Sequence, residues 1–194
     1  MNQIEARAGV FDASQDKQRS SDLFQLFDEF YHTARSLQQK YAPQISLLVG
    51  MEIDWIRSSS KIFIQDLLDK YPLDVVVGSV HHVHSIPIDY SKEMYEQALV
   101  TCDGSTERLY EAYFDAQYEM LCALKPPIVG HFDLIRLYSN SPNASLKTFP
   151  TVWSKISRNV AFVVDYQGIF EINSAALRKG LQEPYPSMDV CQVR

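Results

Sequence analysis

The chain has 194 residues, of which 46% are hydrophobic and 22% charged, and this is enough for one globular domain with its own core. Its formal charge of −6 argues against a nucleic-acid surface as the main function, because phosphate contacts require clustered Lys and Arg. No apolar run approaches the roughly 20 residues that a bilayer crossing requires, and the polar start lacks the apolar core of a signal peptide. We therefore expect a soluble cytoplasmic protein with neither a membrane nor a nucleic acid as partner.

Apolar, strand-favouring runs alternate along the chain with amphipathic stretches of helical spacing. Residues 1–20 are polar and predict a flexible lead-in, and because no linker interrupts residues 21–194 we expect one domain there. In chain order we predict helices over residues 21–41, 59–71, 91–100, 105–124 and 150–159, strands over 45–54, 73–81, 128–132, 161–164 and 168–173, and then a polar tail.

The alternation of strands and helices indicates βα units and a parallel sheet. Two architectures fit this pattern, a closed barrel and a doubly wound open sheet. No glycine-rich phosphate loop follows any predicted strand, which argues against a nucleotide-binding open sheet. Metal-ligand side chains at several strand ends favour a barrel, because barrel active sites are assembled at the carboxyl ends of the strands.

Three of the predicted strands end in residues that commonly bind metals. They are Glu52 in GMEID, His81 in GSVHH and His131 in GHFD. Because side chains alternate along a strand, Glu52 shares a face with Asp54, and His131 shares one with Asp133. A carboxylate and two imidazoles that converge at one rim would bind a divalent cation such as Zn²⁺, Mn²⁺ or Fe²⁺.

Residues beside these ligands predict supporting roles. His82 points to the opposite face from His81 and is predicted to support it from behind. Asp133 is predicted to orient His131, with a cap on the next helix as the alternative. His84 lies in a loop, where a substrate contact and a plain surface position are equally compatible with the sequence.

Two arginines are candidates for binding a phosphate group. Arg136 and Arg178 qualify because a guanidinium can donate two parallel hydrogen bonds to phosphate oxygens. The alternative for each is an arginine that is solvated or paired with a carboxylate. We predict a substrate contact from each of them.

Five segments of the chain form a set of motifs in a fixed order. They are VGMEIDWI, VGSVHHVHSIPIDY, FDAQYEML, KPPIVGHFDLIRLYS and EINSAALRKGLQEPYPS. Together these segments resemble the fungal type of histidinol phosphatase in the polymerase-and-histidinol-phosphatase (PHP) family. The resemblance begins near residue 22 and continues to the end.

This resemblance implies a distorted (β/α)₇ barrel with up to three divalent metals. It further implies metal-assisted hydrolysis of a small phosphomonoester, L-histidinol phosphate, to histidinol and phosphate in histidine biosynthesis. By motif, Glu52 corresponds to the bridging carboxylate of the family, and His81 and His131 correspond to metal-binding imidazoles.

The chain departs from the family pattern at two places. The family begins with a His-x-His pair on its first strand and ends with an Asp-x-His on its last strand. Neither motif is found at the corresponding place in this sequence. His82-Val-His84 has the spacing of the His-x-His pair, but it lies in a later segment. The resemblance therefore predicts a barrel without its first and last strands, with fewer metals and compromised activity. The alternatives are a non-catalytic remnant that binds one ion weakly and another phosphoesterase of the same family.

Overall fold

The computed structural model describes residues 13–193, which begin with a long helix, α1 (Ala13–Tyr41). Residues 1–12 of the predicted lead-in lie outside the described residues. The predicted helix start at Ser21 is wrong, because residues 13–20 already belong to α1. No Gly or Pro occurs between Ala13 and Ser21, so nothing in the sequence forces the helix to start later.

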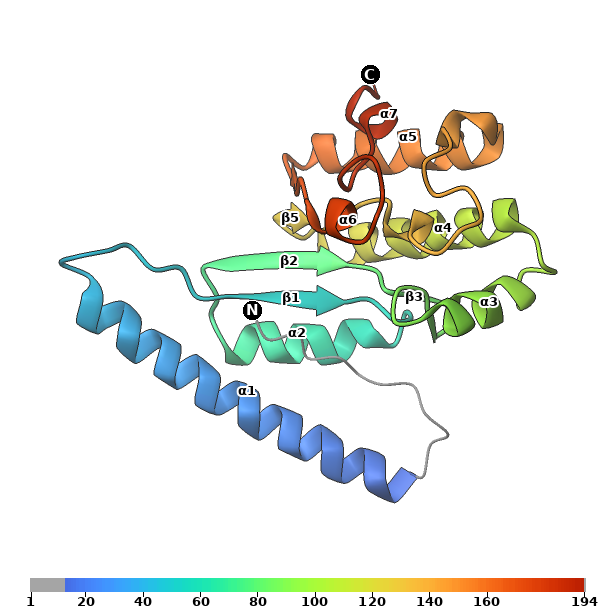
Figure 1. Cartoon of the computed structure of the whole chain (residues 1–194). Coiled ribbons are helices and arrows are strands. Elements are labelled where there is room, and N and C mark those ends of the chain that lie inside the picture. Colours follow the sequence, from blue (N-terminus) through green and yellow to red (C-terminus); the bar gives the residue numbers. More distant parts are fainter. Residues whose placement is uncertain (1–12, 194) are drawn as a thin grey trace.

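A four-stranded parallel sheet with the order β1-β2-β5-β6 forms the centre of the fold (Figure 1). The register pairs Glu52 with Val77 and Asp54 with Ser79, so neighbouring strands end at the same edge of the sheet. The predicted parallel α/β sheet is confirmed, and within the described residues β1 and β6 form its two edges. The strands are β1 (Gly50–Asp54), β2 (Val75–Ser79), β5 (Ile128–Val129) and β6 (Ile169–Phe170).

Three of the helices between these strands agree with the predicted ones, the last continues to Asp165 instead of residue 159, and a short hairpin follows β2. Ser91 and Ser105 cap α3 and α4, since their hydroxyls accept hydrogen bonds from the N–H groups of Met94 and Arg108. The helices are α2 (Ser60–Lys70), α3 (Lys92–Val100), α4 (Thr106–Leu124) and α5 (Pro150–Asp165), the 3₁₀ turns are η1 (Leu134–Arg136) and η2 (Leu146–Thr148), and the hairpin is β3 (His82–Val83) with β4 (Ile86–Pro87).

The predicted strand over residues 161–164 is wrong, because these residues form the last part of α5. The buried positions of α5 are Val152, Ile156, Asn159 and Val163, which are spaced by four, three and four residues. That spacing is helical, so Val163 near the end of α5 extends the apolar face of the helix. Burial against α4 therefore outweighs the preference of valine for strands.

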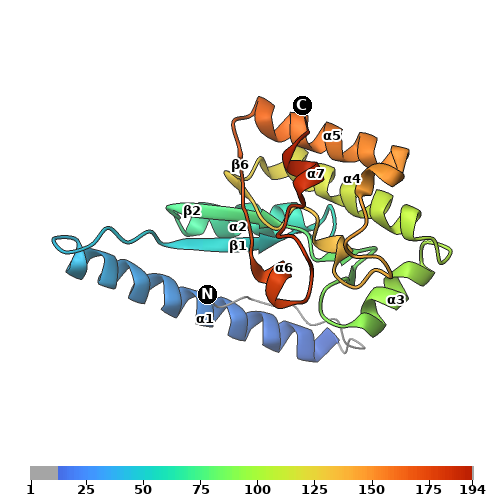
Figure 2. The ribbon, with the colours of Figure 1, turned by 45° about the horizontal axis from the view of Figure 1, so that its top comes forward.

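The predicted polar tail is instead a folded segment that packs on the core (Figure 2). Asn173 and Tyr185 form an isolated antiparallel bridge. Leu181, Tyr185 and Val190 are buried, and they are the apolar residues that anchor this segment. It contains two short helices, α6 (Ala175–Arg178) and α7 (Met188–Cys191).

Helix α4 packs closely against β2, and this contact positions the strand end. Gly78 of β2 has no side chain, and a Cβ added there would lie 2.6 Å from Cγ of Pro126. The same Cβ would lie 3.2 Å from Sδ of Met120 on α4. A glycine at this position therefore permits the close approach of the helix to the strand.

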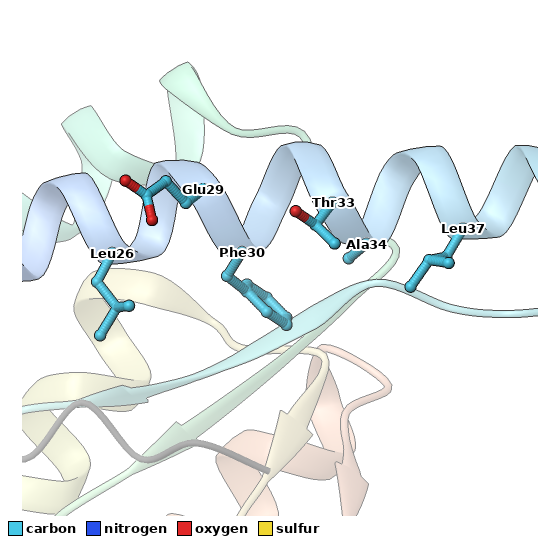
Figure 3. Close-up of a pocket in the computed structure, with 6 residues that line it drawn as sticks. All are labelled: Leu26, Glu29, Phe30, Thr33, Ala34 and Leu37. Carbon is cyan, nitrogen blue, oxygen red and sulfur yellow. The ribbon is translucent and has the colours of Figure 1, made fainter.

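Helix α1 contacts the rest of the protein through a narrow face. Phe27 is buried against Tyr71, with ring centroids 5.0 Å apart, whereas Leu26 and Phe30 are 57% and 45% exposed. Figure 3 shows Leu26, Phe30 and Leu37 along one side of α1, where they line a shallow hollow. The apolar side of this helix is thus only partly buried. None of the helices within residues 13–193 combines the length and the apolar character that a membrane crossing requires.

The core around α4 makes a specific prediction for stability. Leu121 of α4 is fully buried, so Leu121→Ala should lower the free energy of unfolding by about 2–5 kcal/mol through the cavity that it leaves. Leu177→Ala removes the same atoms from a side chain that is 49% exposed and serves as the control. Urea denaturation of both variants checks the difference, and equal losses would contradict this description of the core.

Candidate metal centre

The parallel strands bring three of the predicted ligands to one edge of the sheet. Glu52 lies within β1, while His81 and His131 follow the ends of β2 and β5. These strands are neighbours, and Figure 1 shows the arrowheads of β1 and β2 at the same end. As a result, one potential ligand atom from each of Glu52, His81 and His131 lies within 4.8 Å of the other two.

Both imidazoles direct their Nε2 atoms toward a single oxygen of Glu52. Oε1 of Glu52 lies 3.0 Å from Nε2 of His131 and 3.5 Å from Nε2 of His81. The two imidazole rings pack edge to face, with centroids 4.7 Å apart. The three side chains are 9–20% exposed, so the cluster is largely shielded from water but still reachable. This donor set, one carboxylate and two imidazoles, suits Zn²⁺, Mn²⁺ or Fe²⁺.

The side chains of the cluster shift one another's pKa values. Burial by itself would raise the pKa of Glu52, but the hydrogen bond and charge of His131 outweigh it and lower the pKa to about 2. Burial would lower the pKa of His81, but the Asp54 carboxylate and the charges of Asp89 and Glu52 raise it to about 9. Glu52 is therefore an anion at neutral pH, as a metal ligand must be. A cation that binds here would have to displace the proton of His81, because only a neutral imidazole binds a metal through Nε2.

Asp54 lies behind His81 and was not among the predicted site residues. Its Oδ1 accepts a hydrogen bond from the backbone N–H of His81 at 3.2 Å and lies 3.3 Å from the Nδ1 of the same residue. Its Oδ2 lies 2.9 Å from Nδ1 of His82, a buried residue of β3. His82 thus supports His81 only through Asp54. The feature of the sequence that could have identified Asp54 is the alternation of side chains along the strand, which puts Asp54 on the same face as Glu52.

The predicted contact between Asp133 and His131 is wrong. Strand β5 ends at Val129 and His131 has a φ of 20°, so alternation along the strand no longer applies beyond this point. Asp133 is fully buried, and its Oδ2 lies 2.8 Å from Nε of Arg136 and accepts a hydrogen bond from the N–H of Ser187 at 2.9 Å. The backbone N–H of His131 instead donates to Oε2 of Glu171, at 2.9 Å.

Glu171 is a second residue that the sequence reasoning did not assign to the site. It follows β6, and its other carboxylate oxygen accepts a hydrogen bond from the side-chain amide of Asn173 at 3.1 Å. The signal was again the alternation of Glu171 with Asn173 at the end of a strand. Glu171 therefore connects the fourth strand of the sheet to the loop that carries His131.

Arg136 does not have the free guanidinium that the phosphate prediction requires. Only 2% of it is exposed, and besides Asp133 it donates to the carbonyl oxygens of Pro142 and Pro184, each at 3.0 Å. The prediction of a substrate contact is therefore wrong for Arg136 in this structure. Its guanidinium holds together η1, the loop that contains Pro142 and the C-terminal segment.

The two remaining predicted substrate contacts are exposed and lie outside the cluster. Arg178 in α6 makes one long hydrogen bond to Oγ of Ser174, at 3.5 Å. His84 lies at the turn between β3 and β4, where its Nδ1 is 2.9 Å from Oγ1 of Thr101. Across the part of the chain that the structure describes, neither side chain hydrogen-bonds to Glu52, His81 or His131.

Comparison with known proteins places these observations in a family. The PHP domain matches residues 16–175. The probable histidinol-phosphatase of Schizosaccharomyces pombe is 43% identical over 173 residues, which are 89% of this chain and 56% of that protein. The histidinol-phosphatase of Saccharomyces cerevisiae is 33% identical over 193 residues, or 86% of this chain and 58% of that protein.

A solved structure supports the same assignment at the level of the fold. The crystal structure of the "putative histidinol phosphatase hisK" from Listeria monocytogenes superimposes with a TM-score of 0.74 at 25% sequence identity. The match covers 85% of this chain and 65% of that one. The chain spans a little over half the length of the two yeast proteins that it matches. With the PHP domain matched over most of its residues, this chain belongs to the PHP family.

Proposed function

We propose that this chain contributes a metal centre to a histidinol phosphatase, which hydrolyses L-histidinol phosphate to histidinol and phosphate in the cytoplasm. The observation that carries the proposal is the convergence of Glu52, His81 and His131 within 4.8 Å at one edge of the sheet. The names of the two yeast relatives support the choice of substrate.

The proposed metal ligands are the three residues that converge. Glu52 supplies its shared Oε1, and the two imidazoles supply their Nε2 atoms, which already point at that oxygen. A divalent cation held there would supply Lewis acidity toward the phosphoryl oxygens and activate a water molecule. We propose Zn²⁺, Mn²⁺ or Fe²⁺, and the three ligands are sufficient for one such ion.

Substrate binding is proposed for the two exposed side chains, Arg178 and His84. The guanidinium of Arg178 has only a 3.5 Å contact with Ser174 to give up, so most of its donors are available for phosphate oxygens. His84 lies on the hairpin that begins at His82, directly after His81, which keeps it in the same region of the chain as the proposed ligands.

Phosphate release tests the proposed reaction. With added Mn²⁺ or Zn²⁺, the chain should release phosphate from L-histidinol phosphate at the compromised rate that the sequence predicts, and Glu52→Gln should reduce that rate by about 100-fold because it removes the anionic ligand. A colorimetric phosphate assay with and without a chelator measures both effects. Glu96→Gln, on the exposed side of α3, is the matched control and should keep the rate. Release that is unaffected by Glu52→Gln would refute the proposal.

Two arginine substitutions should separate substrate binding from structural support. Arg178→Ala should raise KM by about tenfold, because a hydrogen bond to a charged phosphate is lost in ground state and transition state alike. Arg136→Ala should instead lower the free energy of unfolding by about 3–5 kcal/mol, since it leaves the buried Asp133 charge unpaired. Steady-state kinetics and urea denaturation of both variants measure the two effects. If Arg136→Ala changed KM without lowering the free energy of unfolding, this would contradict the structural role that we assign to Arg136.

A further inference from the structure

We infer that Asp54 is a positioning residue for His81: its carboxylate holds the imidazole so that Nε2 faces the shared oxygen of Glu52. The inference rests on the proposed metal centre and adds a residue that the metal itself would not touch. It starts from the three nitrogen atoms that surround the Asp54 carboxylate.

The two contacts of Asp54 with His81 fix both the backbone and the ring. Oδ1 accepts from the His81 backbone N–H at 3.2 Å and lies 3.3 Å from the ring Nδ1. Because Nδ1 and Nε2 lie on opposite sides of an imidazole, a carboxylate at Nδ1 leaves Nε2 as the atom presented to Glu52, at 3.5 Å. Such a partner sets the tautomer and the orientation of a ligating imidazole and makes it a stronger base.

The other oxygen of Asp54 is held from the opposite side. His82 is only 6% exposed, and its Nδ1 lies 2.9 Å from Oδ2. Asp54 itself belongs to β1, whose pairing with Ser79 in β2 sets its height at the edge of the sheet. The carboxylate is therefore placed by its strand, with the His82 ring at ion-pair distance on its far side, so it can act as a support for His81.

The second imidazole of the cluster lacks an equivalent partner. The Nδ1 atom of His131 is buried and, in the part of the chain that the structure describes, has no hydrogen-bond partner. Its orientation depends on Glu52 at Nε2 and on the hydrogen bond from its backbone to Glu171. Of the two imidazoles, His81 alone is backed by a carboxylate, so the loss of Asp54 should act on one ligand.

Binding of Co²⁺ to the full chain tests the role of Asp54 without reference to activity. Asp54→Asn keeps the size of the side chain but removes its charge and replaces one of the two oxygens that face the imidazoles of His81 and His82. We expect Asp54→Asn to weaken Co²⁺ binding by about 10–100-fold, the usual effect of removing a partner of a metal ligand. Titration followed by the visible absorption of Co²⁺ measures the affinity, and the intensity of the bands reports the loss of an imidazole ligand.

Asp74→Asn is the matched control. Asp74 stands at the opposite end of the same pair of strands, where it accepts from the N–H of Val49 at 2.8 Å and pairs with Arg35. It therefore has a structural role comparable to that of Asp54 but lies away from the cluster. Thermal unfolding of both variants, without metal, shows how much each substitution destabilises the fold. Asp74→Asn should leave the Co²⁺ affinity unchanged.

The outcomes separate this inference from the proposed function. If Glu52→Gln weakens Co²⁺ binding and Asp54→Asn does not, the metal centre stands and the positioning role is refuted. Equal losses of affinity in Asp54→Asn and Asp74→Asn would also refute it, because the effect would then follow from general destabilisation. If the unsubstituted chain does not bind Co²⁺, or if Glu52→Gln binds it equally well, the proposed centre fails and the inference fails with it.

Discussion

Parallel pairing of β1, β2 and β5 is the constraint on which the site depends. Strands that run in the same direction end at the same edge, and the register of β1 with β2 is one-to-one from Gly50 with Val75 to Asp54 with Ser79. A shift of one residue would move Glu52 to the other face of the sheet. The close contact of α4 at Gly78 and the hydrogen bonds between the strands fix this register, so the backbone itself determines which side chains meet.

Two sets of buried charges lie behind this edge and serve different purposes. In the first, Glu52 and Asp54 face the imidazoles of His81, His82 and His131, and both carboxylates have lowered pKa values despite their burial. In the second, Asp133 and Arg136 form an ion pair and draw the C-terminal segment onto the core. In the first set, Nε2 of His81 and Nε2 of His131 both point at Oε1 of Glu52, so a cation could bind to all three atoms. The second is closed, because its donors and acceptors are already used by the protein.

The sequence predicted most helices and the parallel sheet, and its errors have local causes. Residues 161–164 are rich in strand-favouring residues, yet they continue α5 because Val163 completes a helical row of buried positions. The segment after residue 173 looks polar, yet Tyr185 and Val190 anchor it. In both cases a few apolar residues pack against segments that are distant in the sequence. The local preference of a residue for helix or strand carries no information about such contacts.

For the proposed metal site, the sequence by itself determined the candidate ligand types and their places at three strand ends, because metals require particular donor atoms and alternation fixes which side chains share a face. It also determined the family through the motifs around Glu52, His81 and His131. Only the tertiary structure decided that Asp54 stands behind His81, that Glu171 holds the loop of His131, and that Arg136 is buried beside Asp133. These are contacts between distant segments, and packing of the whole chain decides which of them form.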